Sequence, residues 1–347
     1  MSTKKVCICG HFGFGETLLN GQTIKTKIVT EQLEQIYGVE QVSKLDTKGG
    51  VSNLVRLPFS LPRALKNNDN VVIFPAQNGL QVIAPLLTLF NKIYKRKLHY
   101  VVIGGWLSEL LSNKKFLTKQ LKKFDGIYVE TSTMKKQLKD MGFKNIYVMP
   151  NCKPLDVLSE DELVYPSAEP YKLCTFSRVM KEKGIEDAIE AVKHINEKFG
   201  REVFTLDIYG QVEDSQLDWF ERLCANSPKY VTYGGAVDFD KSVEVLKDYF
   251  ALLFPTRFFT EGIPGTIIDT YAAGVPVISS KWESFADMVK DGKTGIGYKF
   301  GKPKRLAEIL ERVCTSPEEI LNMKKECIET AKQYLPENAV DVLAKRL

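Results

Sequence analysis

Two loops in the second half of the sequence combine charged and glycine residues in an order that suits an anionic ligand. The first, residues 177–184 (SRVMKEKG), places Arg178 and Lys183 between the apolar run 172–176 and a helical stretch that begins near residue 185. Two cations beside the positive end of a helix would attract a phosphate or a carboxylate. The alternative reading of this loop is a solvated basic turn.

The second loop, residues 255–269 (PTRFFTEGIPGTIID), follows the apolar run 251–254 and leads into a helix. Pro264 suits the first position of that helix, which puts Glu261 in the loop and Asp269 one turn inside the helix. These carboxylates could accept hydrogen bonds from vicinal hydroxyls, as acids do on a ribose. Three residues bring backbone N–H groups that could hold hydroxyls or phosphate oxygens: Gly262, Gly265 and Thr266. A solvated loop acid and a surface helix acid are the alternatives.

A third loop, residues 10–15 (GHFGFG), follows the first apolar run of the chain. Its glycines, which include Gly13 and Gly15, allow the backbone to approach a ligand phosphate or sugar closely. Their spacing is not G-x-G-x-x-G, which argues against a nicotinamide-dependent oxidoreductase. The alternative is a tight turn. His11 is the one histidine of the three whose place suits a functional role.

Strands and helices must hold these loops in place, and the sequence pattern predicts strands that alternate with helices. Short apolar runs predict strands, and longer stretches such as 27–37, 134–141 and 185–199 predict helices. Strands that are apolar along their whole length indicate parallel sheets covered on both faces. The predicted strands are 5–9, 70–74, 99–103, 126–129 and 145–149 in the first half, and 172–176, 204–209, 230–233, 251–254 and 276–279 in the second.

The alternation stops once, at residues 154–170, which are rich in proline and acidic residues and indicate a linker. We therefore predict the α/β class, with two Rossmann-like domains that face each other across a cleft. The N-terminal domain covers residues 1–153 and the C-terminal domain residues 171–330. Residues 331–347 form a helical tail that we expect to pack back on the N-terminal domain. In such sheets ligands bind at the carboxyl ends of the strands, where all three loops lie.

The composition is that of an ordinary globular protein, with 347 residues of which 44% are hydrophobic and 26% are charged. The net charge of +5 is too small to indicate a nucleic-acid partner. The seven cysteines form no C-x-x-C pair and no cluster of metal ligands is visible, so we expect reduced thiols and no metal site. The first apolar stretch is too short for a signal peptide and the run 82–90 too short for a membrane span, so we expect a cytoplasmic protein.

The small net charge hides a difference between the two halves. Residues 1–150 hold 22 Lys and Arg against 10 acids, a balance of +12, whereas residues 151–347 hold 26 against 33, a balance of −7. In the basic half, the segment 107–124 (LSELLSNKKFLTKQLKKF) places leucines near helical spacing with lysines between them. A basic amphipathic helix can lie on an anionic bilayer, so we expect peripheral membrane contact through the N-terminal domain. The alternative is a helix whose apolar side packs in the core.

The second half of the sequence resembles the retaining glycosyltransferases of family 4, which have the GT-B fold. The resemblance rests on two acids eight positions apart, Glu261 and Asp269, followed by the run AGVPV at residues 273–277. The basic loop 177–184 and the segment 146–151 (IYVMPN) add to it. The resemblance extends over nearly the whole chain, more faintly in the first 130 residues.

The resemblance implies a role for each matching residue of the second half. In this family the positions of Arg178 and Lys183 bind the donor diphosphate, and the position of Glu261 contacts the donor sugar. The position of Asp269 binds the ribose, although the family usually has glutamate there. Amides of the loop after Glu261 assist in donor binding, and here they belong to Gly262, Ile263, Gly265 and Thr266.

The implied enzyme moves a sugar from a UDP- or GDP-linked donor to a hydroxyl of a glycan or a lipid-linked acceptor. It retains the anomeric configuration, requires neither a cofactor nor a metal, and serves surface polysaccharide biosynthesis. The loop with Gly13 and Gly15 approaches the diphosphate or the sugar. Arg178, Lys183 and helix N-termini would stabilise the charge of the departing diphosphate. An epimerase-like nucleotide-sugar enzyme and a non-catalytic sugar-nucleotide-binding partner of another transferase are the alternatives.

Overall fold

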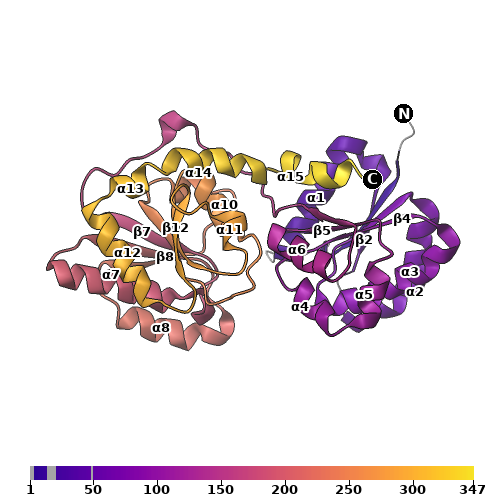
Figure 1. Cartoon of the computed structure of the whole chain (residues 1–347), viewed down its shortest axis with the longest axis horizontal. Coiled ribbons are helices and arrows are strands. Elements are labelled where there is room, and N and C mark those ends of the chain that lie inside the picture. The colour runs from indigo at the N-terminus through magenta and orange to yellow at the C-terminus, as the bar shows by residue number, and fades with distance from the viewer. Residues whose placement is uncertain (1–3, 14–20, 48–49) are drawn as a thin grey trace. The chain divides into compact units, whose positions relative to one another are not determined.

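The chain forms two compact units in the computed structural model, which describes residues 4–13, 21–47 and 50–347 (Figure 1). The first unit is made of Met1–Pro154 together with Tyr334–Leu347, and the second of Leu155–Gln333. The sequence places its own boundaries at residues 153 and 331. Each unit builds its own sheet and its own core.

The first unit contains a six-stranded parallel sheet in the order β2-β1-β3-β4-β5-β6. This is the flavodoxin-like order, in which the direction of winding reverses between β1 and β3. The loops that leave these two strands lead to opposite faces of the sheet, so a crevice opens between them at the carboxyl ends. The strands are β1 (Val6–Gly10), β2 (Val42–Asp46), β3 (Asn70–Ile73), β4 (Lys97–Val101), β5 (Gly126–Val129) and β6 (Ile146–Val148).

Helices cover both faces of this sheet (Figure 1). Successive strand residues enter different cores, so that Val6 packs on one face and Cys7 on the other. Side chains of α1 (Gly21–Tyr37) and α15 (Pro336–Ala344) fill the core on the Val6 face. The other face is covered by α2 (Gly50–Asn67), α3 (Gln77–Tyr94), α4 (Leu107–Ser112), α5 (Lys115–Leu121) and α6 (Ser132–Asp140). Burial on both faces explains why these strands are apolar throughout.

The second unit contains another six-stranded parallel sheet, in the order β12-β11-β10-β7-β8-β9. Counted from β7, this is the Rossmann order, and winding reverses between β7 and β10. Its strands are β7 (Tyr171–Phe176), β8 (Phe204–Tyr209), β9 (Val231–Gly235), β10 (Ala251–Phe254), β11 (Val277–Lys281) and β12 (Gly295–Lys299). The predicted α/β class with two Rossmann-like sheets is confirmed.

The helices of the second unit also pack in pairs around its sheet. α7 (Ile185–Phe199) packs against α12 (Lys304–Thr315) over one core, and α10 (Gly265–Ala272) packs against α14 (Lys324–Ala331). The remaining helices are α8 (Leu217–Ala225), α9 (Ser242–Leu246), α11 (Phe285–Met288) and α13 (Glu318–Leu321).

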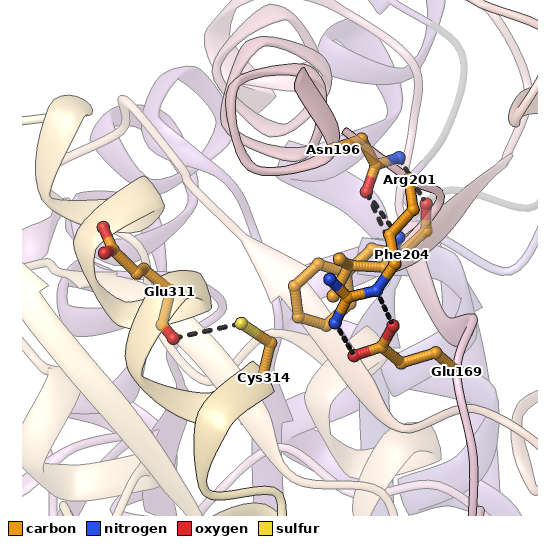
Figure 2. A network of polar contacts seen from close by, with 7 residues as sticks. Glu169, Asn196, Arg201, Phe204, Glu311 and Cys314 are labelled. Carbon is orange, nitrogen blue, oxygen red and sulfur yellow. Dashed lines mark hydrogen bonds and ion pairs between the residues drawn. The ribbon is translucent and has the colours of Figure 1, made fainter. Parts of the chain in front are cut away.

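Polar side chains fix the chain where it enters the second unit. Figure 2 shows Glu169 pointing at Arg201, whose Nε and Nη2 donate to the two carboxylate oxygens at 2.7 and 3.0 Å. Asn196 of α7 lies nearby, and its Nδ2 donates to the carbonyl of Phe204 while its Oδ1 accepts from the N–H groups of Val203 and Phe204. These bonds hold the start of β8 beside β7, the strand that leads to the functional loops.

Several elements differ from the prediction, among them the edge strand β12, which is absent from the predicted strands. The sequence does not predict β2, because this edge strand carries exposed polar residues such as Ser43 and Lys44. It does not predict α2 either, because Pro58 and Pro62 lie inside that helix. Segment 107–124 forms two short helices, α4 and α5, rather than one. Within residues 4–13, 21–47 and 50–347, no helix has the length and apolar character that crossing a bilayer requires.

The C-terminal segment completes the core of the first unit. Val340 and Leu343 of α15 are fully buried beside Ile28 and Leu33 of α1. The hydroxyl of Tyr37 at the end of α1 donates to the carbonyl of Ala344 at 2.6 Å. The chain therefore returns to the first unit after building the second.

His99 in β4 makes the stability of the protein depend on pH. It is buried between the hydroxyl of Tyr128 and the amide oxygen of Asn70, at 3.1 and 3.3 Å from its ring nitrogens, and burial lowers its pKa to about 4. As pH falls from about 6.5 towards 4, His99 becomes protonated in the unfolded chain but stays neutral in the folded chain. The free energy of unfolding therefore falls by up to about 3 kcal/mol. Urea denaturation at pH 7 and pH 5 should show a smaller loss for His99→Gln than for the parent. His194→Gln, at an exposed position on α7, should lose as much as the parent, and an equal loss in all three chains would contradict the assignment.

Candidate functional site

A pocket of about 530 Å³ opens at the point of reversal in the second unit, between the loops that follow β7 and β10. Its volume lies in the range of about 300–1,000 Å³ that small-molecule sites occupy. Among the residues that line it are Arg178, Lys183, Phe258, Glu261, Gly265 and Thr266. The structure thus brings the three predicted catalytic residues, which are up to 83 positions apart in the chain, into one pocket wall.

Lys183 and Glu261 form an ion pair in this wall. Both side chains are largely buried, at 17% and 15% exposure. The Thr256 hydroxyl donates to Oε1 of Glu261 at 3.1 Å, and Nζ of Lys183 lies 5.2 Å from the centre of the Phe258 ring, a cation–π arrangement. The pair therefore holds its geometry before a ligand enters.

The start of α10 supplies the helix N-terminus that the pocket needs. The N–H groups of Gly265 and Thr266 are in the first turn, where a helix has no acceptor of its own for them, and this turn contains no acidic residue. In the described part of the chain, Oγ1 of Thr266 is buried without a hydrogen-bond partner. The sequence also offers the start of α7 for an anion, but Glu186 and Asp187 occupy its first turn and already offset its positive end. The N-terminus available to an anion is that of α10.

Arg178 reaches the pocket from a more exposed position. Its side chain is 58% exposed, and its Nη1 lies 3.1 Å from Oε2 of Glu213. An exposed ion pair of this kind contributes roughly 0–1 kcal/mol, so the guanidinium can leave Glu213 at low cost. A planar guanidinium suits bidentate binding of phosphate. Arg178 could therefore exchange its contact with Glu213 for a contact with a phosphate in the pocket.

The two loops are locked against each other outside the pocket. The N–H of Arg257 donates to the carbonyl of Glu182 at 2.8 Å, and its Nε and Nη2 donate to the carboxylate of Asp187 at 3.0 and 2.8 Å. At Gly184, where φ is +73°, a Cβ atom would lie 2.1 Å from the carbonyl oxygen of Pro255. Only glycine permits this approach of the two loops. These contacts fix Lys183 and Glu261 relative to each other.

Other predicted donor-binding residues lie behind the pocket surface. Gly262, Ile263 and Asp269 are buried, and Asp269 is only 3% exposed in the second turn of α10. The reading of Asp269 as a surface helix acid is therefore wrong. Contact of this carboxylate with a ribose stays a prediction.

The glycine loop of the first unit holds an internal carboxylate. Oδ1 of Asp46 accepts from the N–H of Phe12 at 3.2 Å, and Oδ2 accepts from the N–H of Gly13 at 3.1 Å. Gly13 has φ of +59°, which suits the turn that the loop makes. Gly15 lies outside the described residues. The amides of Phe12 and Gly13 thus already bind Asp46, and the role of Gly13 and Gly15 at a donor stays a prediction.

A second pocket, of about 460 Å³, opens at the point of reversal in the first unit, between the loops after β1 and β3. The ring of Trp106 forms an apolar wall, and the polar lining comes from His11, Gln22, Thr47, Gln77 and Asn78. None of its described lining residues is Asp, Glu, Lys or Arg. The pocket therefore suits a neutral ligand with several hydroxyl groups.

The leucines of the amphipathic segment 107–124 do not form an exposed face. Leu107, Leu111, Leu117 and Leu121 are buried in the core of the first unit. The prediction that this face lies on a bilayer is wrong, and the alternative of a core-packed helix pair with solvated lysines is right. Apolar side chains are exposed instead on α3 and α5, which pack together: Leu89, Ile93 and Phe116.

Sequence reasoning missed two sets of residues that build the sites. Thr256 contacts Glu261 of its own loop, whereas Asp187, the partner of Arg257, lies in α7 and comes near only when the two loops meet. Lys25 of α1 and Glu130 after β5 form a buried ion pair at 2.6 Å near the carboxyl edge of the first sheet, and Lys25 also donates to the carbonyl of Val102 at 3.2 Å. Lys25 stands among other polar residues such as Thr23, Thr26 and Lys27, so nothing in the sequence marks it as buried.

The ion pair of Arg257 and Asp187 should position the catalytic residues. Arg257→Ala frees the loop after β10 from α7, so we expect kcat to fall about 10- to 100-fold while the melting temperature changes little. Asp187→Arg combined with Arg257→Asp should recover part of kcat. Arg257→Lys should recover less, because lysine cannot form the bidentate contact. Steady-state kinetics of these variants test this role, and full activity of Arg257→Ala would contradict it.

The sequence of the second unit matches a known family. Residues 164–334 match the family model described as glycosyl transferases group 1. An uncharacterized glycosyltransferase of Methanocaldococcus jannaschii, MJ1069, is 26% identical over 171 residues, which are 48% of this chain and 41% of that protein. An uncharacterized 41.2 kDa protein in the cps region of Klebsiella pneumoniae is 25% identical over 303 residues, which are 81% of this chain and 79% of that protein.

Solved structures show the same fold. Anabaena Alr3699/HepE in complex with UDP and glucose is similar with a TM-score of 0.73 at 13% identity, over 99% of this chain and 98% of that one. The lipopolysaccharide outer core galactosyltransferase WaaB is similar with a TM-score of 0.71 at 17% identity, over the same shares. At such low identity these likenesses show the fold alone, and it is the predicted one.

Proposed function

We propose, from the premise that residues 164–334 carry a domain of the glycosyl transferases group 1, that the chain transfers a sugar from a nucleoside diphosphate to an acceptor hydroxyl. A domain of this family makes the chain a glycosyltransferase enzyme. The finer proposal is a retaining transferase that uses a UDP-linked sugar, with a GDP-linked sugar as the other candidate donor. UDP is favoured because the similar fold of HepE was solved with UDP and glucose.

The observation that carries the proposal is the pocket between the loops after β7 and β10. It places Arg178, the Lys183–Glu261 pair and the N-terminus of α10 around one volume. Cations and helix N–H groups suit a diphosphate, and the carboxylate of Glu261 suits the hydroxyls of a sugar.

The mechanism we propose uses charge that is already in place. As the bond between the anomeric carbon and the diphosphate breaks, negative charge grows on the leaving oxygen, and Arg178, Lys183 and the start of α10 stabilise it. The departing phosphate accepts the proton of the acceptor hydroxyl, which attacks the face that the diphosphate leaves. This course retains the anomeric configuration without a protein nucleophile and without a metal ion.

The acceptor binds, in this proposal, at the pocket of the first unit. Its neutral, hydrogen-bonding lining with Trp106 as a wall suits a sugar ring, because aromatic rings pack against the apolar faces of sugars. Trp106→Ala should therefore raise KM for the acceptor while KM for the donor stays unchanged. A change in the donor KM alone would reject this assignment.

We further propose that the first unit contacts an anionic membrane at the inner face of the cell and that the product enters surface polysaccharide. The proposal rests on the basic balance of the N-terminal half and on the exposed Leu89, Ile93 and Phe116. The names of two similar proteins support the role in surface polysaccharide: the protein of the cps region and the lipopolysaccharide galactosyltransferase. Sedimentation with anionic vesicles should fall for Ile93→Ser with Phe116→Ser, and unchanged sedimentation would leave a soluble acceptor.

The transfer reaction itself gives the test of the proposed function. The chain is incubated with a panel of UDP- and GDP-sugars and a hydroxyl acceptor in the presence of EDTA. We expect release of the nucleoside diphosphate and a product whose anomeric proton shows the configuration of the donor by NMR. An inverted product would reject retention, and release of nucleotide only after metal is added would reject the metal-free mechanism.

A further inference from the structure

Two polar side chains of α1 contact the loops that build the pocket of the first unit. Gln22 and Lys25 are three positions apart, so they lie on one side of the helix. Nε2 of Gln22 donates to the carbonyl of Phe74, the first residue after β3, at 3.0 Å. Nζ of Lys25 donates to the carbonyl of Val102, the first residue after β4, at 3.2 Å. Helix α1 thus holds two loops at the points where they leave the sheet.

The loop after β4 links Lys25 to Trp106. Val102 is fully buried, and the carbonyl of the next residue, Ile103, accepts from Nε1 of Trp106 at 2.7 Å. Gly104, with φ of +80°, lets the chain turn back between Ile103 and Trp106. The position of the indole ring, which lines the pocket, therefore depends on the backbone of residues 102 and 103.

Stability alone does not explain the buried pair of Lys25 and Glu130. Removing two charges from water is costly, and apolar residues of similar volume are often as stable as a buried ion pair. Neither side chain lines the pocket, so neither contacts a ligand there. Glu130 lies between β5 and the start of α6, where the hydroxyl of Thr131 accepts from the N–H of Met134 at 3.1 Å. Its carboxylate, 2.6 Å from Nζ, is therefore a fixed partner that orients the ammonium of Lys25.

We propose that Lys25 is a positioning residue for the acceptor, because it holds the carbonyl of Val102 and thereby the ring of Trp106. The inference rests on the proposed function, which places the acceptor at this pocket. Without the ammonium, the buried carbonyl of Val102 loses this donor, and the loop shifts until another donor or water reaches it. The indole ring then leaves its position, so the acceptor binds more weakly while the donor is unaffected.

The informative variant replaces both charges at once. Lys25→Met/Glu130→Leu leaves no charge buried alone, so its melting temperature should stay close to that of the parent. We expect KM for the acceptor to rise about fivefold or more and KM for the donor to stay within about twofold. Lys25→Gln/Glu130→Gln is a second uncharged pair, with a side chain at position 25 that is too short to bridge to Val102, and it should give the same changes.

A matched control removes another buried polar contact of the same unit. The hydroxyl of Thr88 in α3 donates to Oε1 of Gln120 in α5 at 2.8 Å, and both side chains are buried. Thr88→Val/Gln120→Leu should leave both KM values at those of the parent. An equal rise of the acceptor KM in this control would overturn the specific role of Lys25.

A signal of Trp106 itself separates this role from the proposed function. The chain has three tryptophans, and the indole N–H resonance of Trp106 is identified by its loss in Trp106→Phe. In Lys25→Met/Glu130→Leu this resonance should shift and its hydrogen should exchange with solvent about fivefold faster or more, whereas the resonances of Trp219 and Trp282 should not change.

The outcomes of the two measurements are distinct. An unaltered Trp106 resonance in Lys25→Met/Glu130→Leu would overturn the positioning role. An acceptor KM that stays at the parent value in this variant, although Trp106→Ala raises it, would overturn the role as well. If Trp106→Ala leaves the acceptor KM unchanged, the acceptor site is wrongly placed, and the Trp106 resonance still decides whether Lys25 positions the loop.

Discussion

Lys183→Ala is expected to lower kcat/KM for the nucleotide-sugar donor by about 10²- to 10³-fold, the loss of roughly 3–4 kcal/mol of transition-state stabilisation. The ammonium of Lys183 lies in the pocket wall and is held there by Glu261, so its charge is placed before the diphosphate departs. Steady-state rates with saturating acceptor measure the effect. The melting temperature should stay close to that of the parent, because the side chain is at the surface of a pocket rather than in the core.

A matched control lies on the same turn. Lys181→Ala removes an exposed cation that does not line the pocket and should leave kcat/KM within about threefold. Because Lys183 and Glu261 act as one unit, the double variant Lys183→Ala/Glu261→Ala should have a kcat/KM only slightly lower than that of Lys183→Ala alone. If the double variant loses kcat/KM by a factor equal to the product of the factors for the two single variants, Lys183 and Glu261 act independently. Near-normal rates for Lys183→Ala would contradict its role at the diphosphate.

Lys25→Met is expected to destabilise the first unit by about 3–5 kcal/mol, because it leaves the Glu130 carboxylate buried without its cation. The two side chains are only 1% and 4% exposed and 2.6 Å apart, and they join α1 to the carboxyl end of β5. Lys25→Met with Glu130→Leu removes both charges and should recover most of that loss. Urea denaturation, followed by a probe of the first unit, measures the three free energies of unfolding.

An exposed pair provides the scale for this prediction. Lys345→Ala breaks the ion pair with Asp341 in α15 of the same unit, whose side chains are 69% and 45% exposed, and should cost at most about 0.5 kcal/mol. If Lys25→Met lowers the free energy of unfolding no more than Lys345→Ala does, or if the double variant is less stable than Lys25→Met, burial of the Lys25–Glu130 pair does not have the assigned effect.

Much of the pocket between the loops after β7 and β10 could be predicted from the sequence, because its residues follow short apolar strands. The runs 172–176 and 251–254 are unambiguous, so the loops after them had to reach the carboxyl edge of a sheet, where Arg178, Lys183 and Glu261 are found. What the sequence does not contain is the strand order. Only the order β10-β7 makes these loops neighbours and so creates the ion pair of Lys183 and Glu261.

The remaining errors arise where local pattern and tertiary packing disagree. Leucines between lysines in the segment 107–124 fit both a membrane surface and a core, and only the position of α4 and α5 against the sheet decides for the core. The start of α7 looked suited to an anion, but Asp187 there binds Arg257, 70 positions away. Such long-range partners have no signature in the sequence.

Binding of nucleotides to the parent chain and to Lys183→Ala tests whether the pocket holds a diphosphate. Calorimetric titration with UDP, GDP and ADP requires neither the acceptor nor the identity of the sugar. We expect UDP or GDP to bind and ADP to bind at least tenfold more weakly. Lys183→Ala should weaken binding of the preferred nucleotide about tenfold or more, and Lys181→Ala should not. Absence of binding by all three nucleotides, or equal binding by the parent and Lys183→Ala, would contradict a diphosphate site between the loops after β7 and β10.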